Sequence, residues 1–118
     1  MAPKKDFPKS KTAIIANAGT ESTKFKIPDN AVAVGVKIPD ITAGILYIEC
    51  SDDEGVSFAK VVDPSTGEAL IIADSGQDPA FVDISDYVRF ATNELDFRIV
   101  SASAQGAEKT FKLYFSSL

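Results

Sequence analysis

The sequence contains no histidine and no tryptophan, and it has one cysteine among its 118 residues. Without histidine, no imidazole is present to activate a serine or the lone thiol, and zinc lacks a common ligand. Cys50 cannot form an internal disulfide, which excludes a disulfide-stapled scaffold and agrees with a reducing compartment. Two carboxylates could still hydrolyse a glycosidic bond, but nothing selects one pair among the 17 acidic residues. We therefore expect no enzyme, no cofactor and no metal ion.

Long apolar runs are also absent. No stretch approaches the roughly 18 apolar residues of a membrane span, and the lysine-rich start lacks the apolar segment of a signal peptide. We expect a protein that is made in the cytoplasm and has no membrane partner. With 45% hydrophobic and 25% charged residues, the chain has the composition of one folded domain.

Charge is divided unevenly along the chain. Residues 1–12, MAPKKDFPKSKT, hold four lysines and one aspartate, which leaves a net charge of −8 on the other 106 residues. An acidic body of this kind is a poor partner for nucleic acid. Two prolines and the lack of periodicity predict a flexible basic arm over residues 1–12, followed by the folded domain over 13–118. The arm is a plain tail, a segment that orders on a protein partner or, as a third alternative, a contact for nucleic-acid phosphate. Its candidate contacts are Lys4, Lys5, Lys9 and Lys11.

Apolar residues recur at every second position, which is the rhythm of β-strands. The alternation is visible in FKI at 25–27, AVAVGVKI at 31–38, ILYIEC at 45–50, LDFRI at 95–99 and TFKLYF at 110–115. Three further strand-like runs lie between these, SFAKVV at 57–62, ALIIA at 69–73 and AFVDI at 80–84. Turn residues separate these runs. We predict an all-β fold, a single antiparallel, jelly-roll-like β-sandwich of about eight strands with an extended N-terminal arm. The segment SDYVRF at 85–90 is expected to form one helical turn, capped by Ser85 or Asp86.

The stretch SDDEGVSF at 51–58 lies between two of these strands and reads as the loop of a β-hairpin. Its glycine can adopt the positive φ that closes such a loop, and its central aspartate can accept hydrogen bonds from the turn. The positions Ser51, Asp53, Gly55, Ser57 and Phe58 resemble the Asp-box, S-x-D-x-G-x-[ST]-[WF], a hairpin motif of sialidases and many unrelated β proteins. That resemblance implies a folding device. A cation site and a catalytic acid are the alternatives, but the loop lacks the regular oxygen ligands of an EF-hand.

A longer series of motifs follows the same order along the chain. It consists of VGVKIP at 34–39, the hairpin at 51–58, DPSTG at 63–67, FVDISDY at 81–87, FRIVS at 97–101 and KTFKL at 109–113. From about Thr20 to Leu118 this order resembles a class of small virion proteins of tailed bacteriophages. Two features depart from that pattern: the hairpin has Phe58 in place of the usual tryptophan, and the lysine-rich arm has no clear counterpart.

The resemblance implies a phage structural component, located in the virion after synthesis in the host cytoplasm. A capsid decoration or cement protein that binds and stabilises the outer shell is the first expectation, and a head-fibre base or a tail-associated component is the alternative. The implied partners are the major capsid protein or other virion subunits. A homo-oligomer such as a trimer is also expected, because decoration sites follow local symmetry axes.

A carbohydrate-binding module is the other function that the sequence leaves open. A β-sandwich with asparagine, aspartate and glutamine in its loops suits sugar recognition, and Tyr47, Tyr87 and Tyr114 fall on the outward phase of their segments. Outward tyrosines also occur at the rims of protein contacts, which is the simpler interpretation.

Overall fold

The computed structural model describes residues 10–28, 31–41, 44–74, 78–88 and 94–116. This part of the chain contains eight strands and one short 3₁₀ helix, so the expected all-β class is confirmed. The elements are β1 (Ser10–Ile15), β2 (Ala33–Ile38), β3 (Ile45–Ser51), β4 (Ala59–Lys60), β5 (Ile71–Asp74), β6 (Ala80–Asp83), η1 (Ser85–Tyr87), β7 (Asp96–Ser101) and β8 (Lys109–Ser116).

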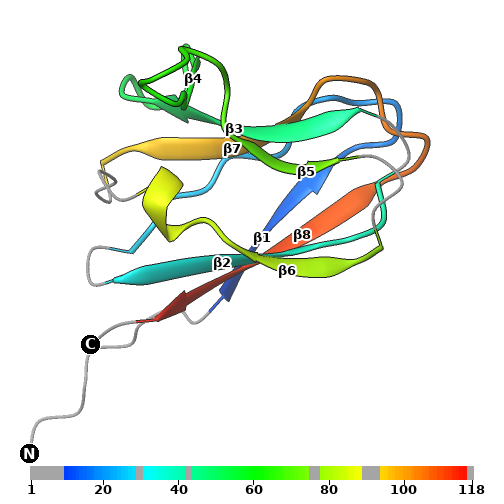
Figure 1. Cartoon of the computed structure of the whole chain (residues 1–118). Coiled ribbons are helices and arrows are strands. Elements are labelled where there is room, and N and C mark those ends of the chain that lie inside the picture. Colours follow the sequence, from blue (N-terminus) through cyan, green and yellow to red (C-terminus); the bar gives the residue numbers. More distant parts are fainter. Residues whose placement is uncertain (1–9, 29–30, 42–43, 75–77, 89–93, 117–118) are drawn as a thin grey trace, which may run out of the picture.

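The strands form two antiparallel sheets. The first has the order β1-β8-β2-β6, and in the second β3 pairs with β4, β5 and β7. Figure 1 shows the sheets as two stacked layers, with the first sheet below the second. Their inner faces bury one continuous apolar core, which confirms the predicted sandwich.

The connectivity is that of a jelly roll when the segment before β2 is counted. Phe25 and Phe97 exchange two backbone hydrogen bonds of 2.8 Å, and Glu21 forms a further bridge to Val100, so residues 21–25 lie along β7. The sequence predicted a regular strand near Phe25, and the structure instead has these isolated bridges. Counted along the chain, the eight units are then β1, residues 21–25, β2, the β3–β4 hairpin, β5, β6, β7 and β8. In this count one layer has the order 1-8-3-6 and the other has the order 2-7-4-5, which is the arrangement of two interlocked Greek keys.

The core follows from the alternation in the sequence. Phe111, Leu113 and Phe115 of β8 are buried while the residues between them are exposed. From the other sheet Phe97 stacks against Phe25, with ring centroids 6.1 Å apart. Each sheet therefore has one apolar face turned inward and one face turned to solvent, and the outward faces remain for function.

The predicted boundary of the arm was wrong by three residues. Ser10, Lys11 and Thr12, which we assigned to the arm, belong to β1 and pair with β8. Lys11 donates a 2.8 Å hydrogen bond from Nζ to the Lys26 carbonyl, and its ammonium lies 6.0 Å from the centre of the Phe115 ring. The aliphatic stem of Lys11 thus covers the end of the core. A sequence pattern that classes lysine as polar does not reveal this contact.

The helical turn after β6 is present, but its predicted cap is not. The N-cap residue of η1 is Ile84, with no side-chain capping bond. The Ser85 hydroxyl instead accepts a 2.8 Å hydrogen bond from the Val34 backbone and donates one of 2.6 Å to Asp83. Ser85 therefore joins the turn to β2 rather than capping a helix.

Candidate functional site

The acidic stretch at 51–58 connects β3 to β4. Glu49 is paired with Lys60, and Cys50 with Ala59, so the two strands form a hairpin. Glu54 and Gly55 both have left-handed backbones, with φ of 62° and 87°. A glycine at the second of these positions removes the steric cost that a side chain would add there.

Hydrogen bonds inside this loop occupy the Asp53 carboxylate. Its Oδ1 accepts from the Ser51 hydroxyl at 2.5 Å and from the Ser57 backbone N–H at 2.9 Å, and its Oδ2 accepts from the Ser57 hydroxyl at 2.5 Å. The hydroxyl of Ser51, which is buried, also accepts a 2.9 Å bond from the Gly55 N–H. These bonds to Ser51, then to Ser57, lower the pKa of Asp53 to about 2. The carboxylate is therefore ionised and already bonded through both oxygens at neutral pH.

The last residue of the predicted hairpin motif lies against charged side chains of the second sheet. The Arg98 guanidinium stacks on the Phe58 ring, 3.9 Å from its centre. The same guanidinium contacts Glu49 at 2.6 Å and Glu21 at 2.6 Å. Phe58 thus covers the hairpin base, and the surrounding charges are paired with one another rather than available to a ligand.

We expect Asp53→Ala to lower the melting temperature at pH 7 by roughly 5 °C, because the loop loses the acceptor of three hydrogen bonds. The pKa of Asp53 is depressed in the folded state, so its contribution is complete above the unfolded value near 4 and disappears as the pH falls toward 2. Thermal melts across this pH range should show the wild type and the variant converging. Asp52→Ala is the matched control, since this neighbour is exposed, accepts no such bonds from the described residues and should melt like wild type. Equal melting of wild type and Asp53→Ala at pH 7 would contradict the structural role.

The outward face of the first sheet presents two neighbouring aromatic rings to solvent. Phe81 of β6 is 71% exposed and Tyr114 of β8 is 37% exposed, with ring centroids 6.0 Å apart. These strands flank β2, and the rings approach each other where Gly35 of β2, opposite Tyr114, has no side chain. Two exposed aromatic rings in contact across the outward face, one of them on the edge strand β6, are typical of a contact surface.

Two lysines accompany these rings. Lys37 of β2 lies directly opposite Lys112 of β8, and both side chains are exposed. The Lys37 ammonium lies 5.7 Å from the centre of the Phe81 ring, and that of Lys112 lies 5.4 Å from the centre of Tyr114. Within the described residues neither lysine forms an ion pair. We refer to Lys37, Phe81, Lys112 and Tyr114 as the lysine–aromatic face.

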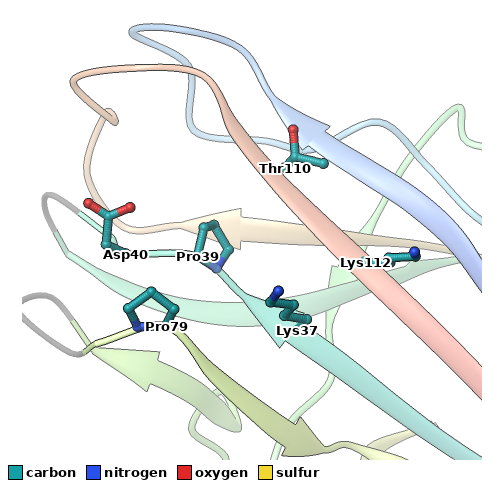
Figure 2. Close-up of a pocket in the computed structure, with 6 residues that line it drawn as sticks. All are labelled: Lys37, Pro39, Asp40, Pro79, Thr110 and Lys112. Carbon is teal, nitrogen blue, oxygen red and sulfur yellow. The ribbon is translucent and has the colours of Figure 1, made fainter.

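A shallow hollow of about 390 Å³ adjoins this face at the end of the sheet. Figure 2 shows its lining, formed by Lys37, Pro39, Asp40, Pro79, Thr110 and Lys112. The Asp40 carboxylate lies 3.6 Å from the Lys109 ammonium, so its charge is matched from within the protein. The volume lies within the range of small-ligand and side-chain pockets, and both face lysines border it.

The sequence identified only part of this surface. Tyr114 was expected on an outward phase and lies there, while Tyr47 on the other sheet is half-buried beneath the Lys60 ammonium, 5.2 Å from its ring centre. The side chain of Tyr87 lies outside the described residues, as do Lys4, Lys5 and Lys9 of the proposed arm. Phe81 was missed because Val82 beside it is equally apolar, so alternation does not reveal which of the two points outward.

Comparison of the chain with protein-family models, curated protein sequences and solved structures finds no match. In the part of the chain that the structure describes, no helix has the length and apolar character to cross a membrane. The same residues contain no group of three or more cysteine, aspartate or glutamate side chains placed to hold a metal ion. The half-buried Cys50 thiol has a raised pKa, mainly through burial, so it is a weak nucleophile at neutral pH.

Proposed function

We propose that the chain is a non-enzymatic structural protein of a tailed-phage virion, a capsid decoration or cement protein that binds the outer shell and stabilises it. The observation that carries the proposal is the lysine–aromatic face, where Phe81 is 71% exposed beside Tyr114 and beside two lysines that form no ion pair with any described residue. A surface of this kind suits protein contact better than chemistry.

The ordered series of motifs supports the virion assignment, and the fold is compatible with it. Jelly rolls occur in viral capsid domains and also in lectins, so the fold alone does not choose between them. The function proposed here works by linkage: a protein that binds only the assembled shell shifts the equilibrium toward assembly. Repeated copies around local symmetry axes would be expected, in trimers or another closed arrangement.

The test is immunogold labelling of intact virions of the phage that encodes this chain, with antibody raised against the purified protein. Dense labelling over the head is the expected result. Labelling confined to the tail or to one vertex would shift the function to a fibre or adaptor component. Absence of labelling, with the antigen confirmed in dissociated virions by immunoblot, would contradict binding at the outer surface.

A carbohydrate-binding module is the second candidate, favoured by one observation. The 390 Å³ hollow is bordered by Lys37 and Lys112, whose ammonium groups lie near the two exposed aromatic rings, so a sugar could combine hydrogen bonds in the hollow with stacking on a ring. The rings are tilted by 47° rather than coplanar, which makes a poor platform for a flat sugar face. Saturable binding in a glycan screen at millimolar ligand would support this candidate, and its absence would remove it.

A further inference from the structure

We infer that the lysine–aromatic face binds an extended, acidic segment of a shell subunit, with a carboxylate held between Lys37 and Lys112 and apolar side chains on either side. This inference rests on the function proposed above, since it names the chemistry of the partner. The face would therefore select a segment in which apolar and acidic residues alternate, rather than bind proteins without selectivity.

The first argument is the unbalanced charge of the lysine pair. Lys37 and Lys112 are directly opposite each other on neighbouring strands, an arrangement of like charges that destabilises a sheet. Their other cross-strand neighbours are Phe81 and Thr12, which carry no charge. No described carboxylate pairs with either lysine, although the whole chain has 17 acidic residues and a net charge of −5. A partner carboxylate would relieve this repulsion.

The second argument is that the aromatic rings hold the two ammonium groups close to the sheet. Each ammonium lies within 6 Å of the centre of an exposed ring, at 5.7 Å for Lys37 and 5.4 Å for Lys112. Side chains restrained in this way lose less conformational entropy when they bind an anion. The rings also provide apolar area beside the charge, which an apolar residue of the partner can cover.

The third argument is the spacing along β8. Thr110 borders the hollow, Lys112 belongs to the lysine pair and Tyr114 belongs to the aromatic pair, and all three project from the same face. Alternate residues of a strand are roughly 6.6 Å apart, which is also the spacing of alternate side chains in an extended peptide. A segment lying along β8 would thus place an apolar residue in the hollow between Pro39 and Pro79, a carboxylate on the lysines and a second apolar residue on the rings.

The experiment measures sedimentation of the purified protein with heads that lack it, at increasing salt. The test variant is Lys112→Glu, and we expect its affinity to fall by about tenfold or more and wild-type binding to weaken as salt is added. The matched control is Lys60→Glu, because Lys60 lies over Tyr47 on the opposite sheet at a similar distance. This control should bind as the wild type does.

A second measurement separates binding from folding. Lys112→Glu replaces a repulsion with an attraction to Lys37, so the isolated variant should melt at the same temperature as the wild type or higher while it loses binding. A damaged fold would lower both the melting temperature and the affinity for heads. Carbodiimide cross-linking adds a direct readout, since it joins a lysine amine to a nearby carboxylate, and mass spectrometry should find Lys37 or Lys112 linked to an aspartate or glutamate flanked by alternate apolar residues.

The outcomes distinguish the inference from the proposed function. Failure of the wild type to bind heads would overturn the proposed function, and with it this inference. Wild-type binding that Lys112→Glu leaves unchanged, or that Lys60→Glu reduces equally, would overturn the inference alone. Self-association of the wild type that Lys112→Glu abolishes would assign the face to a second copy of the chain. Binding of a labelled single-stranded oligonucleotide that the same variant removes would assign it to nucleic acid.

Discussion

Replacing Phe97 with alanine is expected to lower the free energy of unfolding by about 4 kcal/mol, which is typical of a fully buried phenylalanine. Phe97 has no exposed surface, and its ring stacks on Phe25 at 6.1 Å between the two sheets. The truncation removes apolar contact area and leaves a cavity, because the backbone of β7 is bonded to both β3 and the segment at Phe25. Chemical denaturation monitored by circular dichroism measures this change.

Phe81→Ala is the matched control, since it makes the same chemical change at an exposed position. Phe81 is 71% exposed, so its removal should alter the free energy of unfolding by no more than about 0.5 kcal/mol. If the two variants lost comparable free energy of unfolding, the assignment of Phe81 to an outward face would be wrong. The contrast also tests whether the lysine–aromatic face is dispensable for folding, as a contact surface should be.

Gly44→Ala is expected to destabilise the protein by about 3 kcal/mol, the sum of backbone strain and a steric clash. The φ of Gly44 is +76°, a left-handed conformation that an alanine adopts only with strain. An added Cβ would also lie 2.8 Å from the backbone nitrogen of Ser103, which cannot move without disturbing the turn after β7. Thermal or chemical unfolding measures the loss.

Gly67→Ala separates these two causes. Gly67 has a similar φ of +72°, but a Cβ built there has no heavy atom within 4 Å. This variant should lose only the strain contribution, about 1 kcal/mol. If both alanine variants were equally stable, the close packing of Gly44 against Ser103 would be refuted.

The alternation of apolar residues was sufficient to predict most of the sandwich. In β8, Phe111, Leu113 and Phe115 alternate with Lys112 and Tyr114, and only one side of such a strand can face a core. β1 escaped prediction because its inward residues are Lys11, Ala13 and Ile15, and a lysine that covers the core with its stem looks polar in a sequence. The sequence pattern thus shows which residues of a strand face the core only where those residues are large and apolar.

The candidate site could not be predicted in the same way. Lys37 and Lys112 are 75 positions apart in the sequence, and their pairing depends on the register between β2 and β8. The hairpin loop at 51–58, by contrast, is made of residues within a few positions of one another, so its turn chemistry was visible in the sequence. Contacts set by sheet register require the folded structure, whereas contacts within a turn do not.

The pairing of the first described strand with the last has a consequence for the order of folding. Ser10 of β1 is opposite Tyr114 of β8, and β8 also separates β1 from β2 in the sheet. During synthesis β1 and β2 therefore have no β8 to pair with until all the residues from β3 to β7 have been made. Loop closure over such a distance is entropically costly, and proteins of this topology fold on the millisecond to second scale. Until β8 arrives, the apolar faces of β1 and β2 are open, and a nascent chain stalled before residue 109 should depend on chaperones to stay unaggregated.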